Sequence, residues 1–236
     1  MAWFVPRQIP LPAGFIGFDP QSSVPDTQFT AYGRHLPHWR REGACYLATF
    51  RLRDSLPEEI VARMRDEQRQ WQARLASAAS KNEGRIPQQE WSEWQAFEQR
   101  RARKLDLLLD EGRGECLLRH AAHRTPLVEA LHHQEGTRVE MLAYAIMPNH
   151  AHVLCRPLPG HALEALLGSW KRRSSQRIHR LLGRSGPMWQ DESWDRIIRD
   201  GDHYATAARY IAKNPLAAGL SEDEATVWLH PTMQGA

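Results

Sequence analysis

The strongest constraint on the fold is a pair of strand-like segments, residues 139–146 and 150–156, separated by only three residues. Within the first segment the side chains follow a period of two, which is the spacing of a β-strand. The intervening Met147-Pro148-Asn149 supplies turn chemistry, because proline fixes φ and asparagine tolerates turn conformations. Strands joined this closely are expected to pair as a hairpin, which predicts an antiparallel sheet.

The segments around this hairpin complete a recognisable order. The residue pattern predicts a strand at 44–52, a helix at about 116–133, a helix at 161–183, a short strand at 194–198 and a last helix at 202–214 that ends before Pro215. With residues 58–110 set aside, the order is strand, helix, strand, strand, helix, strand, plus one C-terminal helix. This is the ferredoxin-like βαββαβ arrangement. The predicted fold class is therefore α+β, with an antiparallel sheet and helices on one face.

Residues 58–110 interrupt that order after the first strand. Their apolar and aromatic residues recur at helical spacing, and residues 84–87 separate two helices. We expect a helical hairpin that turns its aromatic stripe toward the main body. Residues 1–43, rich in proline and glycine, predict an extended arm, and residues 221–236 a C-terminal tail. The main domain is then residues 44–220.

Composition restricts the cellular compartment in which the protein is expected but does not identify its binding partner. The formal charge of +3 permits a polyanionic partner without identifying one. The three cysteines, Cys45, Cys116 and Cys155, include no C-x-x-C pair, so neither a disulfide framework nor a cysteine zinc site is supported. No apolar run approaches the ~20 residues that cross a bilayer. We therefore expect a cytoplasmic protein without a membrane partner.

Four side chains are candidates for chemistry. His150 and His152 are two apart in a predicted strand, so they project from the same face and could share one cation. Tyr210 and Asn214 are four apart on the last helix and share one of its faces. Tyr204, six residues before Tyr210, lies about 240° around the helix from it. The alternative is that Tyr210 packs in the core and Asn214 caps the helix.

Several motifs together resemble those of the REP-associated tyrosine transposases, which belong to the IS200-like, single-tyrosine HUH family. They are Met147-Pro148-Asn149-His150-Ala151-His152-Val153-Leu154, Gly186-Pro187-Met188-Trp189-Gln190, Trp194-Asp195-Arg196-Ile197-Ile198, and Tyr210-Ile211-Ala212-Lys213-Asn214-Pro215-Leu216-Ala217-Ala218-Gly219-Leu220. The resemblance covers roughly residues 44–220, and the motifs jointly are far more specific than any one of them.

The resemblance implies a chemistry and a substrate. It makes His150 and His152 metal ligands, Asn214 a third ligand and Tyr210 the nucleophile. It implies cleavage of single-stranded DNA beside a palindromic hairpin, with a 5′-phosphotyrosine link and a free 3′-hydroxyl. The metal carried over from the family is Mg²⁺ or Mn²⁺, although imidazole ligands alone suit Zn²⁺ or Mn²⁺ better than Mg²⁺. The protein is expected to be a monomer or a homodimer.

Candidate DNA contacts gather on the helix after the histidine strand, with one more on the following strand. They are Lys171, Arg172, Arg173, Arg177, Arg180 and Arg196. Such a cluster neutralises phosphates and gives salt-dependent affinity, although a basic run is also common on a solvated helix face. Trp170, Trp189 and Trp194 could stack on unpaired bases, but burial in the core is the commoner fate of tryptophan.

Two other functions remain open at this stage. One is a DNA-hairpin-binding protein that keeps the scaffold without mobilising DNA. The other, more distant, is a zinc-dependent hydrolase, against which we note no nearby carboxylate in the sequence that offers an obvious general base. The insertion at residues 58–110 and the N-terminal arm depart from the family pattern. We expect them to bear on DNA reading and oligomeric state but not on the chemistry.

Overall fold

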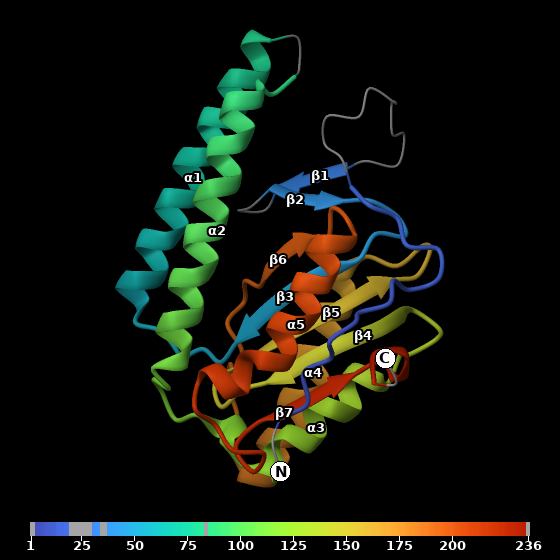
Figure 1. Ribbon diagram of the computed structural model, residues 1–236. Coiled ribbons are helices and arrows are strands. Elements are labelled where there is room, and N and C mark those ends of the chain that lie inside the picture. Colours follow the sequence, from blue (N-terminus) through green and yellow to red (C-terminus); the bar gives the residue numbers. More distant parts are fainter. Residues whose placement is uncertain (1–2, 19–29, 34–36, 83–84, 235–236) are drawn as a thin grey trace.

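A five-stranded antiparallel sheet forms the centre of the computed structural model, which describes residues 3–18, 30–33, 37–82 and 85–234 (Figure 1). The spatial order of its strands is β6-β3-β5-β4-β7. These are β3 (Tyr46–Arg51), β4 (Val139–Ile146), β5 (His150–Pro157), β6 (Trp194–Ile197) and β7 (Thr226–Leu229). All four strand pairs are antiparallel.

The ferredoxin-like prediction is confirmed. Helix α3 (Ala121–His132) follows β3 and its insertion, and helix α4 (Leu163–Leu182) links β5 to β6. The hairpin between β4 and β5 closes through a 2.8 Å hydrogen bond from the Met147 amide to the His150 carbonyl. A short 3-10 turn, Leu117–Arg119, precedes α3, so the predicted single helix from residue 116 starts later than expected.

The helices do not all lie on one face of the sheet, as the sequence had led us to expect. Helices α3 and α4 cover one face, whereas α5 (Gly201–Ala217) covers the other, in front of the sheet in Figure 1. The central strands are buried on both sides, so each face needs a cover. The correction matters because α5 carries Tyr210, which places the candidate chemistry on the face away from α4.

The C-terminal region contains more regular structure than the sequence indicated. Helix α5 continues through Pro215 to Ala217, because a proline in the last turn loses only its own amide hydrogen bond while the Ala218 amide still bonds to the Asn214 carbonyl. Residues 221–236, expected to be a tail, contribute β7 to the edge of the sheet beside β4 and a 3-10 turn, Pro231–Met233.

The insertion is a long helical hairpin of α1 (Glu58–Lys81) and α2 (Gln88–Asp110). It stands beside the β6 edge of the sheet in Figure 1. Its aromatic residues pack mainly between its own two helices, as in the stacking of Trp71 on Phe97, rather than on the main body as expected. Aliphatic residues near its base, including Leu105 and Leu109, form the contact with the body beside Trp194.

The N-terminal arm packs over α5. Trp3 donates a 2.9 Å hydrogen bond to the Leu220 carbonyl, and the Phe15 ring meets Tyr204 edge-on. Two short strands, β1 (Thr30–Gly33) and β2 (Pro37–Arg40), pair with each other. The parts of the predicted arm at residues 1–2, 19–29 and 34–36 lie outside the described residues. Within the described chain, no helix combines the length and apolar character needed to span a membrane.

Candidate active site

Two histidines project from β5 toward α5. His150 and His152 are each 1% exposed, while the alternating Ala151 and Val153 enter the core beneath α3 and α4. The two imidazoles meet edge-on, and their Nε2 atoms are 3.0 Å apart. Thr49, opposite His152 on β3, lies 2.8 Å from its Nδ1 atom. The strand period predicted this shared face.

Hydrogen bonds around Asn149 fix the protonation of His150. The Asn149 amide nitrogen donates to the carbonyls of Leu109 and Arg113, at 3.1 and 3.2 Å. Its Oδ1 is therefore free to accept from His150 Nδ1, 2.8 Å away. With the proton on Nδ1, Nε2 of His150 presents a lone pair toward His152.

Both imidazoles are held in the neutral form. Burial, reinforced by the neighbouring His152, places the pKa of His150 well below its ordinary value. Burial, reinforced by the positive charge of Arg196, lowers the pKa of His152 to about 3. Neutral imidazole is the form that ligates metal ions.

Tyr210 of α5 reaches the histidine pair. Its hydroxyl oxygen lies 3.0 Å from Nε2 of His152, and the two rings meet edge-on with centroids 5.0 Å apart. Burial and the nearby carboxylate of Asp106 raise the pKa of Tyr210 above its ordinary value. Tyr204, in contrast, is 1% exposed and packs in the core between α5 and the sheet.

Asn214 lies one helical turn beyond Tyr210 and is 4% exposed. Its Oδ1 atom is buried and has no hydrogen-bond partner among the described residues. The helix continues past it to Ala217, so the side chain does not cap the helix end. A buried carboxamide oxygen without a partner is costly unless something else binds it.

The donor set fits a divalent cation. Two nitrogens about 2.1 Å from one ion and separated by the observed spacing would subtend about 90° at it, which suits cis ligands. Within the described part of the chain, no group of three or more histidine, cysteine, aspartate or glutamate residues could hold a metal ion. Among other residue types, Asn214 provides a buried oxygen without a partner among the described residues.

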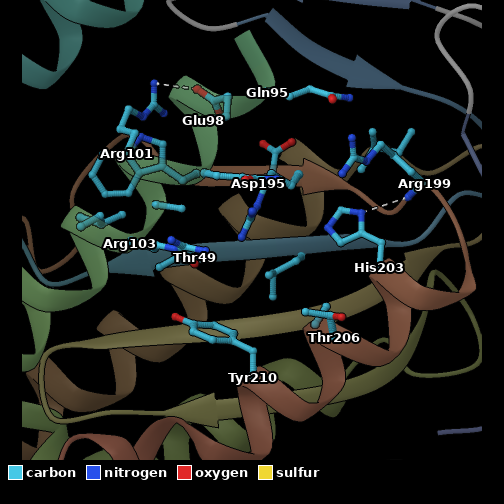
Figure 2. A pocket seen from close by; sticks show the side chains of 18 of the residues that line it. Thr49, Gln95, Glu98, Arg101, Arg103, Asp195, Arg199, His203, Thr206 and Tyr210 are labelled. Atoms are coloured by element: carbon cyan, nitrogen blue, oxygen red, sulfur yellow. Dashed lines mark hydrogen bonds and ion pairs between the residues drawn. The ribbon is translucent and has the colours of Figure 1, made fainter. Parts of the chain in front are cut away.

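A cleft of about 620 Å³ opens beside Tyr210, between α2, the β6 edge and α5. Its lining includes Thr49, Arg101, Asp106, Trp194, Arg196 and Tyr210. Figure 2 shows His203, Thr206 and Tyr210 along α5, with Glu98 and Arg101 of α2 across from them. The insertion therefore forms one wall of the cleft.

Two carboxylates near Tyr210 were missed by the sequence analysis. Asp106 of α2 is hydrogen-bonded to the Tyr210 hydroxyl, and burial raises its pKa above its ordinary value. Asp110 follows one turn later, where burial and the charge of Asp106 raise its pKa to about 6. Their i, i+4 spacing places them on one helix face, but no sequence pattern links that face to a tyrosine about 100 residues later.

Comparison with known proteins finds a similarity in the central part of the chain. Residues 121–214 match the family model described as "Transposase IS200 like". This stretch contains both histidines of the pair, Tyr210 and Asn214. The matched segment is therefore similar to IS200-like transposases.

Two other comparisons add little. No curated protein matches the chain. A solved structure described as "Structure of the REP associates tyrosine transposase bound to a REP hairpin" aligns with 78% of this chain and 76% of its own, at 14% identity and a TM-score of 0.39. Similarity at that level supports no argument about the present chain.

The predicted basic residues lie in two places. Arg196 lines the cleft with Tyr210, whereas the five on α4 lie across the sheet from it. Lys171 donates to the carbonyls of Gln190 and Asp191, and burial lowers its pKa to about 8. Arg177 pairs with Glu129. Of the five basic residues on α4, Arg172, Arg173, Arg177 and Arg180 are exposed to solvent.

The three tryptophans singled out as candidates for base stacking differ in position. Trp170 is fully buried beneath the sheet, and Trp189 is buried with its indole nitrogen donating to Ser174. Trp194 is half-buried and lines the cleft. Of the three, only Trp194 is placed where an unpaired base could stack on it.

Proposed function

We propose that this protein is a metal-dependent single-strand DNA transposase and endonuclease that uses Tyr210 as its nucleophile. The observation that carries the proposal is the placement of the Tyr210 hydroxyl 3.0 Å from Nε2 of His152 within a segment similar to IS200-like transposases. A phenol held beside a neutral histidine pair suits attack on a phosphodiester better than it suits core packing.

The reaction balances as a transesterification. The Tyr210 oxygen bonds to phosphorus, the bond from phosphorus to the 3′-oxygen breaks, and the tyrosine proton is released. The products are a 5′-phosphotyrosine link and a strand ending in a 3′-hydroxyl. The same hydroxyl can attack the link and rejoin the DNA. Because the phosphotyrosine bond conserves the phosphodiester energy, no external energy source is needed.

His150, His152 and Asn214 would hold the cation, Mg²⁺ or Mn²⁺. When bound, it supplies charge neutralisation on a non-bridging phosphate oxygen. The protein's own part is to keep both imidazoles neutral and oriented, through Asn149 and Thr49, and to aim the Tyr210 hydroxyl at the same place.

The DNA partner we propose is a single strand flanked by a palindromic hairpin. The cleft beside Tyr210, with Arg101 and Arg196, would take the strand that is cut. The exposed arginines of α4 remain candidates for phosphate contacts with the duplex part of a hairpin that reaches around the sheet edge. The active unit would be a monomer or a homodimer.

The test is formation of a covalent adduct. Purified protein is incubated with single-stranded DNA that flanks its own gene and contains a palindromic hairpin, with Mn²⁺ or Mg²⁺, and resolved by denaturing electrophoresis. We expect a slow-migrating protein-linked fragment that requires the cation and disappears with EDTA. Tyr210→Phe should lose the adduct, whereas the matched control Tyr204→Phe, away from the site, should keep it.

Other outcomes would favour the alternatives. Tight hairpin binding by the parent protein without any cleavage would indicate a DNA-binding protein on the same scaffold. Phosphodiester cleavage that survives Tyr210→Phe and depends on stoichiometric zinc would indicate a hydrolase. Either result would overturn the proposal.

A further inference from the structure

The end of helix α2, in the insertion, contacts both halves of the candidate site. Asn149, which orients His150, donates to the Leu109 carbonyl of α2 and to the Arg113 carbonyl just after it. Asp106, one turn before Asp110, is hydrogen-bonded to the Tyr210 hydroxyl. Leu105 and Leu109, at 4% and 1% exposure, anchor this end of the helix.

Through these contacts α2 belongs to the candidate site as well as to the wall of the cleft. Asp106 and Tyr210 line the same cleft, so the carboxylate faces the space that we assign to DNA. The residues of α2 that make these contacts precede the family match, which begins at residue 121. The insertion therefore brings to the site groups that lie outside the matched segment.

The hydroxyl of Tyr210 has one proton and two neighbours that could accept it. One is Nε2 of His152, at 3.0 Å, and the other is the carboxylate of Asp106. A nitrogen whose lone pair holds a cation has no lone pair left for a proton. When the histidine pair serves as ligands, Asp106 is the remaining acceptor. Burial, which raises the pKa of Asp106, strengthens it in that role.

We propose that Asp106 of the helical insertion is a catalytic residue that orients the Tyr210 hydroxyl and takes its proton as the bond to phosphorus forms. The inference rests on the proposed function and deepens it. The proton passes from Tyr210 to the Asp106 carboxylate, the phosphorus–oxygen bond to the 3′-oxygen breaks, and that oxygen takes a proton from solvent. In the rejoining reaction the attacking 3′-hydroxyl loses its proton to solvent, the bond from phosphorus to the Tyr210 oxygen breaks, and the carboxylic acid of Asp106 returns the proton to that oxygen.

The experiment measures adduct formation in single turnover, with full-length protein saturating the hairpin-flanked single strand in Mn²⁺. Asp106→Asn keeps the size of the side chain and removes the charge and proton affinity. We expect the rate at saturation to fall about 100-fold or more, the range of general-base effects, with DNA affinity unchanged within about threefold. Asp66→Asn, on the exposed side of α1, is the matched control and should retain the parent rate.

Chemical rescue separates proton transfer from support of the fold. In Asp106→Ala, added acetate or formate should enter the cleft and restore a concentration-dependent part of the rate, whereas chloride at the same ionic strength should not. Thermal unfolding of each variant shows that it is folded. A role limited to packing would give no rescue by small carboxylates.

The outcomes distinguish the two proposals. If the parent protein forms the adduct and Asp106→Asn forms it at the same rate, the role of Asp106 is overturned and Tyr210 remains the nucleophile. A slow Asp106→Asn with no rescue of Asp106→Ala would also overturn the proton-accepting role. If the parent protein forms no adduct, the proposed function itself fails, and the role of Asp106 fails with it.

Discussion

The two faces of the central sheet are built from the same strands but bury different kinds of side chain. On β5, Ala151 and Val153 enter an apolar core under α3 and α4, whereas His150 and His152 point toward α5. Thr49 on the neighbouring strand β3 joins the histidine face. The side chains that β5 contributes to the first face here are apolar, whereas those that it contributes to the second are polar and need specific partners.

The difference shows where stability and chemistry are separated in this fold. A buried polar group costs free energy unless it is hydrogen-bonded or bound. The α5 face meets that cost through Asn149 and Thr49, but leaves the Asn214 oxygen without a partner among the described residues. The opposite face also buries polar atoms, including Ser174 and the indole nitrogen of Trp170, but they lie across the sheet from Tyr210. Substitutions on the two faces should therefore have opposite signatures.

The largest effect is expected at His152. Replacing it with alanine removes one cation ligand and the neighbour of the Tyr210 hydroxyl. We expect the rate of adduct formation to fall about 1,000-fold or more, in line with removal of a catalytic group that acts as part of a unit. Single-turnover electrophoresis measures the rate. The stabilisation that the cation gives in thermal unfolding should disappear too. If His152→Ala kept the parent rate and this stabilisation, the α5 face would not be the face that carries the chemistry.

Trp170 on α4 tests the opposite face. It is fully buried under the sheet, so Trp170→Ala should lower the free energy of unfolding by about 3 to 5 kcal/mol, the usual cost of truncating a buried large aromatic residue. Denaturant unfolding measures the loss. The adduct rate per folded molecule should stay within about twofold of the parent at low temperature, and a selective loss of rate without loss of stability would contradict the separation of the faces.

The smallest effect is expected at Asp110, beside the site. Its pKa is raised to about 6 in the folded protein from an ordinary value of 3.8, so the folded state holds the proton more tightly. This carboxyl therefore lowers stability progressively as pH rises from about 4 to 6. In metal-free buffer, Asp110→Asn should stabilise the protein at pH 7 by about 1 kcal/mol, after allowance for partial exposure.

Thermal unfolding at two pH values checks the sign. At pH 4, where both proteins are uncharged at this position in the folded state, the stability difference should largely vanish. A stabilisation of equal size at both pH values would show that the carboxylate charge is not its cause.

Local periodicity in the sequence accounts for much of the fold. The switch to a period of two predicted β4 and β5 almost to their ends, and the helical spacing predicted the insertion and α4. Both periodicities are set by residues that are close together in the chain. The strand β7 and the side on which α5 packs were missed, because an edge strand of four residues and the choice of a sheet face depend on long-range packing.

The same distinction holds at the site. The sequence by itself determined that His150 and His152 share one face of a strand and that Tyr210 and Asn214 share one face of a helix, since both follow from the geometry of a regular backbone. Only the tertiary structure decided that these faces meet, that the α4 arginines lie across the sheet, and that Asp106 reaches the Tyr210 hydroxyl. Such contacts join residues far apart in the chain, and their geometry is set by how whole elements pack.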